Sequence, residues 1–247
     1  MFSENGYTLE LATSEAAVGK RVPLQFRIID KPGTPLTRYA DTHAKQLHLI
    51  VVGRDLTGFQ HVHPELDASG TWHVPVDFTH AGEYRVFADF TPEGGDGITL
   101  SADVRVVGAY DPRPLPAAAA TAEVDGYTVS LTGSAHAGQT SKLTLSVSYD
   151  GHPVTDLQPY LAAYGHLVAL RASDLAYLHV HPDGHPGDGV TPAGPAIIFY
   201  ATMPSAEDYR LFLDFKHDGV VRTAEFTVTA DNATAPVSEH AHAHHGH

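Results

Sequence analysis

Histidine is the most conspicuous residue type in this chain, with 18 histidines against 15 Lys and Arg together. In the run QHVHP, His61 and His63 are two residues apart, so a β-strand would place both imidazoles on one face, roughly two rises of ~3.3 Å apart. His48 precedes His61 by 13 positions, and a hairpin through GRDLTGF would set it across from His61 or His63. Three converging imidazoles are donors that copper(II) and zinc(II) favour. The spacing therefore predicts a metal site.

The second half of the chain repeats this spacing with His166, His179 and His181. Asp55 and Asp174 lie in the loops between the histidines, where an aspartate could accept the second ring N–H of a ligating histidine or bind the ion itself. His43 and His185 lie near the two motifs and are weaker additional candidates. The predicted ligand set is His43, His48, His61, His63, Asp55, His166, His179, His181 and His185.

Two other interpretations of the histidines stay open. Histidines on a strand face are often packing residues that hydrogen-bond to a carboxylate, which would suit a structural or adhesive β-sandwich module. A mononuclear metal-dependent enzyme would need three ligands, an open coordination position and a nearby base. The repeated spacing, the proline after each HVH and the His-rich end of the chain favour metal binding.

Composition excludes several classes of function. With 29 Asp and Glu the formal net charge is −14, which disfavours nucleic acid and anionic membranes as partners. The chain has no cysteine, which excludes thiolate zinc sites, Fe–S clusters and Cys-ligated copper, and two methionines are too few for a Met-rich copper(I) site. No nucleophile elbow or phosphate-binding loop is recognisable, so we predict a non-enzymatic protein.

No part of the sequence is apolar over the length needed to cross a membrane. The first residues, MFSENGYTLE, have neither a basic nor an apolar segment of a signal peptide. We therefore expect either a cytosolic protein or a sequence from which a leader was removed.

The chain consists of two similar halves. NGYTLEL matches DGYTVSL, LHLIVVGRDLTGFQHVHP matches GHLVALRASDLAYLHVHP, and EYRVFADF matches DYRLFLDF. Between the halves, YDPRPLPAAAATAEV has the composition of an extended, semi-rigid linker. We predict a domain at residues 1–109, a linker at 110–124, a second domain at 125–230 and a disordered His-rich tail at 231–247.

Each half contains seven short segments of alternating apolar residues and no helical pattern, which is typical of an antiparallel β-sandwich, immunoglobulin-like or cupredoxin-like. In one such segment Tyr84, Val86, Ala88 and Phe90 share the face predicted to pack in the core. Arg85, Phe87 and Asp89 alternate with them, and Arg210, Phe212 and Asp214 repeat this opposite face in the second half. The fold class predicted is all-β, with two tandem β-sandwich domains.

The runs HAKQLHLIVVGRDLTGFQHVHP and AGEYRVFADF resemble bacterial extracytoplasmic β-sandwich proteins that share an H..K..H-[LIV]-[LIV]…DL..F.H.HP pattern. Some of these are grouped with YtkA-like and heavy-metal-associated secreted proteins. The resemblance covers about residues 5–108 and 125–230 and implies metal association outside the cytoplasm. It makes His43, His48, His61 and His63 the first site; in the second half His166, His179 and His181 match, but Tyr164 and its neighbours replace the HxxK segment.

Together these observations predict an extracytoplasmic, non-enzymatic protein that binds or buffers a transition metal, copper(II) first and zinc next. The metal ion is the expected partner; no nucleic-acid partner and no membrane span are expected. Because imidazole must be neutral to bind a metal, uptake is expected to weaken as the pH falls through about 6.5.

Overall fold

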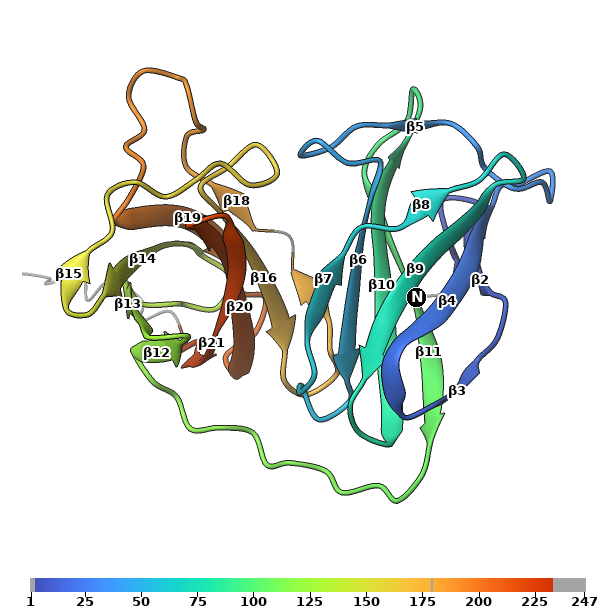
Figure 1. The fold of residues 1–247 in the computed structure, drawn as a ribbon, viewed down its shortest axis with the longest axis horizontal. Helices are drawn as coiled ribbons and strands as arrows, with labels where there is room; N and C mark the ends of the chain where they lie inside the picture. The colour runs from blue at the N-terminus through green and yellow to red at the C-terminus, as the bar shows by residue number, and fades with distance from the viewer. Residues whose placement is uncertain (1–2, 179, 233–247) are drawn as a thin grey trace, which may run out of the picture.

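The computed structural model describes residues 3–178 and 180–232. These residues form two β-sandwiches that lie side by side, and the connecting segment runs along one edge of both (Figure 1). The described residues contain no helix, so none is long and apolar enough to cross a membrane. The tail predicted for residues 231–247 lies outside the described residues from position 233 onward, as does His179.

The first domain consists of two packed sheets. One contains, in spatial order, β1 (Ser3–Glu4), β2 (Tyr7–Leu11), β4 (Gly19–Ile29), β9 (Thr71–Phe78) and β8 (Glu65–Leu66). The other contains β3 (Glu15–Ala17), β11 (Ile98–Val107), β10 (Gly82–Pro92), β6 (Leu47–Gly53) and β7 (Gln60–Val62), with β5 (Tyr39–Ala40) on the end of β10. All pairs are antiparallel except β3 with β11, which is the immunoglobulin-like arrangement.

The second domain repeats this arrangement. One sheet contains β12 (Thr121–Val124), β13 (Tyr127–Thr132), β14 (Thr140–Tyr149), β19 (Ala196–Thr202) and β18 (His181–Pro182), with β15 (His152–Pro153) on β14. The other contains β17 (Tyr177–Leu178), β16 (Gly165–Arg171), β20 (Asp208–His217) and β21 (Val220–Thr229). The prediction of two tandem β-sandwiches is confirmed. The linker is shorter than predicted, because β12 already pairs with β13 from Thr121.

Alternating apolar residues form the core of each sandwich. In β10, Tyr84, Val86, Ala88 and Phe90 are buried in the core of the first domain, as the sequence pattern predicts. Trp72 of β9 is 1% exposed, and its ring nitrogen donates a hydrogen bond to the hydroxyl of Tyr39, 3.1 Å away. Burial of such side chains, worth about 1.5–3 kcal/mol each, holds the two sheets together.

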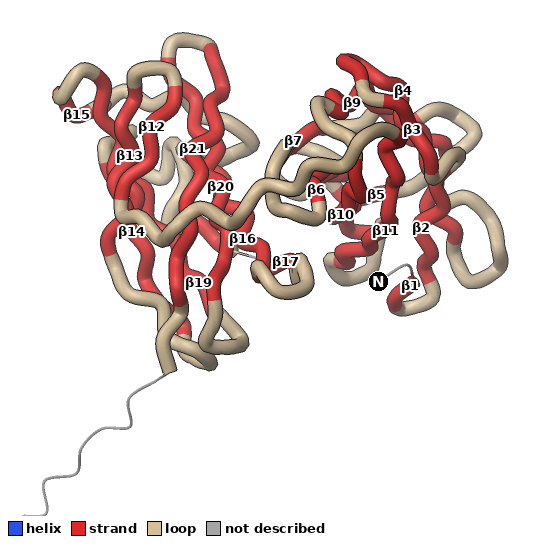
Figure 2. The backbone as a smooth tube through the Cα atoms, turned by 90° about the horizontal axis from the view of Figure 1, so that it is seen from below, coloured by secondary structure: helices blue, strands red, loops and turns tan. Residues whose placement is uncertain are grey.

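The opposite face of β6 and β10 packs against the second domain. A third apolar cluster joins Ile50, Val52, Leu56 and Phe87 to Val168, Leu170, Leu175 and Phe212. Across it the rings of Phe59 and Phe212 stack with centroids 4.0 Å apart and an interplanar angle of 5°. β7 and β16 lie on the facing sides of the two domains (Figure 1), and the tube in Figure 2 shows the turn beside β17 reaching towards the first domain. The β6 strand is therefore buried on both faces.

Candidate functional site: a histidine cluster at the domain interface

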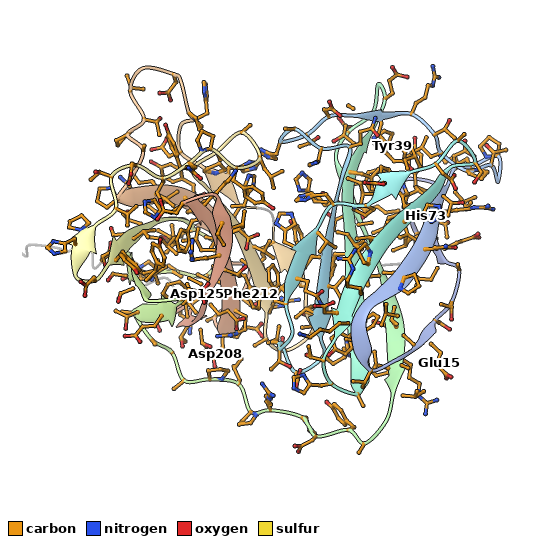
Figure 3. The ribbon with its side chains drawn as sticks, in the orientation of Figure 1. Glu15, Tyr39, His73, Asp125, Asp208 and Phe212 are labelled. Carbon is orange, nitrogen blue, oxygen red and sulfur yellow. The ribbon has the colours of Figure 1, made fainter. Side chains whose placement is uncertain are left out.

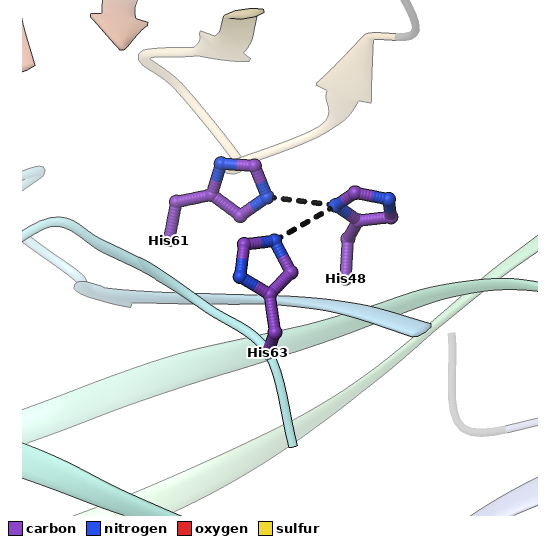
Figure 4. A group of neighbouring side chains, drawn as sticks. All are labelled: His48, His61 and His63. Carbon is purple, nitrogen blue, oxygen red and sulfur yellow. Dashed lines mark hydrogen bonds between the residues drawn. The ribbon is translucent and has the colours of Figure 1, made fainter. Parts of the chain in front are cut away.

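Three imidazoles of the first domain converge on one point (Figure 4). The Nδ1 atom of His48 lies 3.0 Å from Nε2 of His61 and 3.3 Å from Nε2 of His63. One ligand nitrogen from each of the three residues lies within 4.8 Å of the others. They are the only such group of three histidines or carboxylates in residues 3–178 and 180–232.

The hairpin of β6 and β7 brings these residues together. Its antiparallel register pairs Leu49 with Val62 and Ile50 with His61, so position 63 falls opposite His48, just beyond the end of β7. The turn between the strands is closed by Leu56, whose φ of 62° lies in the left-handed region. The local sequence therefore places the histidines, because the register of a hairpin follows from its turn.

Two neighbouring oxygens determine which ring nitrogens carry protons. The carbonyl oxygen of Thr42 can only accept, so His48 donates its Nε2–H to it over 2.9 Å and keeps Nδ1 as an acceptor. The carboxylate of Asp214 accepts from Nδ1 of His61 over 2.8 Å, so that in the neutral form of this ring Nε2 is an acceptor. Two acceptor nitrogens then face each other at 3.0 Å, an arrangement that needs a cation, either a shared proton or a metal ion.

Burial keeps two of the three imidazoles, those of His48 and His63, neutral over a wide pH range. Desolvation lowers the pKa of His48 to about 3, with further lowering by the neighbouring imidazoles and an opposing effect of the Thr42 hydrogen bond. Desolvation also lowers the pKa of His63 to about 3, and the nearby His61 and His48 act in the same direction. Neutral imidazole is the form that binds a metal. His48 and His63 therefore stay in this neutral form to a pH well below 6.5, the ordinary pKa of histidine.

Two of the three nitrogen–nitrogen distances are close to those expected around a small transition-metal ion. Metal–nitrogen bonds of ~2.0–2.1 Å in a tetrahedral site imply nitrogen–nitrogen separations of roughly 3.3–3.4 Å. The observed separations of 3.0 and 3.3 Å are close to these values. Three imidazoles would leave one coordination position for water or another ligand.

The cluster lies between a small cavity and an open groove. The cavity, of about 30 Å³, lies at the domain interface and is lined by His43, His48, His61 and His166, together with Asp89 and Tyr177. It has room for a water molecule or two. On the other side, His63 lines a groove of about 450 Å³ with Glu65 and His73. His73, labelled in Figure 3, lies on β9, away from the second domain, so the groove connects the cluster to solvent.

Two further predicted ligands lie beside the triad without being part of it. The ring of His166 lies 6.3 Å from that of His48 and 5.2 Å from that of His43. His166 donates its Nε2–H to the carbonyl oxygen of Leu161 over 2.9 Å. Burial lowers the pKa of His166 to about 4, and the carbonyl hydrogen bond opposes this shift. The second domain thus adds a neutral histidine to the first domain's cluster.

The remaining predictions need correction. Asp55 is not at the cluster: its carboxylate accepts hydrogen bonds from the Thr57 hydroxyl and from the backbone N–H of Arg113, so it stabilises the turn and the linker. His185 is exposed in its own loop, where its backbone N–H donates to Asp188. His181 is exposed at the start of β18 and pairs with Tyr200. These residues do not join a three-ligand group within the described chain, and His179 lies outside it.

Sequence reasoning missed Asp214 and Thr42. Asp214 lies on β20 of the second domain, where its side chain is 4% exposed and contacts the 5% exposed His61 side chain. A signal was present, since Asp89 and Asp214 interrupt otherwise apolar strands in the runs FADF and FLDF. It could not be used, because the face that these residues occupy meets the other domain, and domain packing is not encoded in a local pattern.

A search of curated proteins found no match to this sequence. Among solved structures, the tetra-tandem repeat in the extending region of a large adhesion protein is similar at a TM-score of 0.30 and 15% identity, over 91% of this chain and 49% of that one. InvD of Yersinia pseudotuberculosis is similar at a TM-score of 0.30 and 12% identity, over 94% of this chain and 61% of that one. This chain thus spans about half the length of the first structure and less than two thirds of the second. The Ig1-2 module of the Drosophila receptor protein tyrosine phosphatase DLAR is similar at a TM-score of 0.23 and 9% identity, over 92% of this chain and 100% of that one. At these TM-scores the likeness carries no argument about function.

The two halves of the sequence also match one and the same family profile. The matched residues are 3–108 and 122–232, which correspond to the two sandwiches. The chain therefore belongs to the family described as a domain of unknown function, DUF8832, and contains that domain twice.

Proposed function

We propose that this protein binds a transition-metal ion through His48, His61 and His63. The observation that carries the proposal is the orientation of the rings. Thr42 and Asp214 each accept a hydrogen bond from one ring nitrogen, so the nitrogens of His48 and His61 that face each other have a place for one cation between them, a shared proton or a metal ion. Metal-ligating histidines usually donate their other ring N–H to a carboxylate or a carbonyl in this way.

Copper(II) is the first candidate ion and zinc(II) the second. All three donors are imidazole nitrogens, which suit both ions, and the chain has no thiolate that would select softer ions. The net charge of −14 favours the approach of cations. We propose binding or buffering without catalysis, because the sequence contains no recognisable nucleophile elbow or phosphate-binding loop. The interdomain cavity beside the rings, about 30 Å³, has room for an ion and a water.

We also propose that the protein acts outside the cytoplasm, which rests on the resemblance of its HVHP-containing runs to extracytoplasmic proteins. Fractionation of the source cells with antibody detection tests this. Recovery in the cytoplasmic fraction alone would contradict it.

A structural two-domain module is the second candidate function. Its support is that the same rings hydrogen-bond to one another and, through His61 and Asp214, across the domain interface. The stacked Phe59 and Phe212 strengthen that interface. In this case the histidines would be packing residues with no need for an ion.

Isothermal titration of the full chain and of a chain ending at Asn232 distinguishes these functions. At pH 7 we expect copper(II) and zinc(II) to bind both chains, and His61→Ala with His63→Ala to weaken binding to the shorter chain at least 100-fold. His73→Ala with His80→Ala removes two histidines outside the triad and serves as the matched control. Equal binding by the control and the triad variant would assign the cluster a packing role.

A further inference from the structure

The histidine cluster depends on the second domain as well as the first. Asp214 projects from β20, and its Oδ2 atom accepts from His61 while Oδ1 accepts from the hydroxyl of Thr223 over 2.6 Å. Its residue exposure is 3%, so the carboxylate is inside the interface. A charged group buried in this way needs its hydrogen bonds, because burial of an unpaired charge is costly. The contact therefore ties the position of the second domain to the orientation of His61.

Other groups of the second domain surround the same cluster. The ring of Tyr160 lies 6.3 Å from that of His63, and the ring of His166 lies 6.2 Å from that of His61. Away from the cluster the domains are joined by the apolar contacts around Phe212 and by a hydrogen bond of 3.4 Å from Arg85 to the carbonyl oxygen of Asp174. The segment between β11 and β12 runs as a loop past both domains (Figure 2). Apart from the contact of Asp214 with His61, the domains are thus held mainly by apolar packing and joined by one loop.

Thermodynamic linkage connects these facts. A carboxylate that orients a ligating histidine typically changes metal affinity 10–100-fold. If Asp214 strengthens ion binding by this factor when the domains are docked, the bound ion must strengthen docking by the same factor.

We propose that the metal centre is shared between the domains, with Asp214 as the positioning residue, so that ion binding locks the second domain against the first. This inference rests on the proposed metal binding and adds its consequence. The bound ion would then hold the docked arrangement of the two domains more tightly than the apolar contacts do alone.

Fluorescence energy transfer between two dyes, one on each domain, tests whether the ion locks the domains together. The chain has no cysteine of its own, so dyes attach only to cysteines that are introduced. Ala68→Cys and Ser134→Cys place one dye on an exposed position of each domain in the full chain. We expect zinc(II) to narrow the distribution of interdomain distances. Asp214→Asn should weaken zinc affinity 10–100-fold and remove the zinc-dependent narrowing at concentrations that saturate the unsubstituted protein.

Arg85→Gln is the control, since it removes an interdomain hydrogen bond outside the cluster. It should change zinc affinity less than threefold and leave the zinc-dependent narrowing intact. If zinc binds without changing the interdomain distances, the proposed lock is wrong while the proposed metal binding stands. This outcome is measured on the unsubstituted chain, so it does not depend on whether Asp214→Asn folds. No zinc binding by the unsubstituted chain overturns both.

Discussion

The two domains have the same histidine spacing on nearly the same backbone, yet among the described residues only the first brings three ring nitrogens together. The backbone of the loop before β6 is repeated before β16. His43 and Ala44 have φ values of 51° and 63°, and Leu161 and Ala162 have 52° and 62°. In both loops a backbone carbonyl accepts the Nε2–H of the following histidine, His48 or His166.

The side chains on this common backbone differ. Leu161 takes the place of His43, and Ala163 takes the place of Lys45, as the matching bridges of Thr42 with Lys45 and Tyr160 with Ala163 show. His63 is half-buried beside His48, whereas its counterpart His181 is exposed. The repeat thus conserves the scaffold that sets the ring of one histidine, while each domain supplies different chemistry around it.

The shared interface gives the two copies complementary roles. Asp89 and Asp214 occupy equivalent positions, and each accepts a hydrogen bond from a threonine of the next strand, Thr99 or Thr223. Asp214 reaches across to His61. Duplication followed by face-to-face packing therefore provides a histidine cluster with a buried carboxylate that a single domain lacks.

The largest effect is expected from the interface aromatics. Phe212→Ala removes a fully buried ring that stacks on Phe59 at 4.0 Å and should lower the free energy of unfolding by about 3–5 kcal/mol. Phe87→Ala, the equivalent change in the first domain, removes a looser contact with Tyr177 at 5.7 Å and should cost less. Urea denaturation of both variants measures the loss in free energy of unfolding. Equal losses would contradict the expectation that the ring of Phe212 contributes more to the interface than that of Phe87.

The second comparison concerns the first histidine of each motif. Glutamine can keep the donated hydrogen bond to the loop carbonyl but replaces a ring nitrogen, so His48→Gln should weaken zinc affinity at least 100-fold. His166→Gln should weaken it less than fivefold, because His166 lies beside the triad and outside it. Calorimetric titration at pH 7 measures the zinc affinity of the two variants. Similar losses would place His166 among the ligands.

The pH dependence of stability should be dominated by the same cluster. Burial lowers the pKa of His48 and His63 to about 3 and that of His166 to about 4, whereas in the unfolded chain histidine titrates near 6.5. Below about pH 6.5 the unfolded chain takes up protons that the folded chain excludes. The free energy of unfolding should therefore fall as the pH decreases from 6.5 towards 4, by at most ~1.4 kcal/mol per pH unit for each histidine.

Urea denaturation between pH 7 and pH 4.5 measures this slope. His48→Gln should flatten it, and saturating zinc(II) should raise stability most near neutral pH. An unchanged slope in His48→Gln would show that His48 does not resist protonation.

The smallest effect is expected at the turn aspartates. Asp55→Asn weakens the hydrogen bonds to Thr57 and to the linker at Arg113 and should cost about 1 kcal/mol. Asp174→Asn, in the corresponding turn of the second domain, weakens an ion pair with Arg171, an exposed contact worth about 1 kcal/mol or less. Thermal unfolding gives both values. Neither change should alter zinc affinity, and a loss in Asp55→Asn would return Asp55 to the metal site.

The sequence by itself determined the fold class, the duplication and the hairpin that gathers His48, His61 and His63. These features follow from local patterns: strand alternation decides which face is buried, and the interval between two strands decides which residues lie opposite each other. The core residues of β10 and β20 could be predicted for the same reason.

Only the tertiary structure decided what surrounds the three rings. The carboxylate that accepts a ring N–H of His61 belongs to Asp214 and not to Asp55, and Asp214 is 153 positions from His61 in the chain. His166 lies beside the first domain's cluster, a neighbourhood that its own motif does not predict. Both results depend on how the two β-sandwiches pack against each other. The alternation of side chains along a strand is the same whether its outer face meets water or another domain. A local pattern specifies which side chains share a face, but only the packed chain specifies what that face meets.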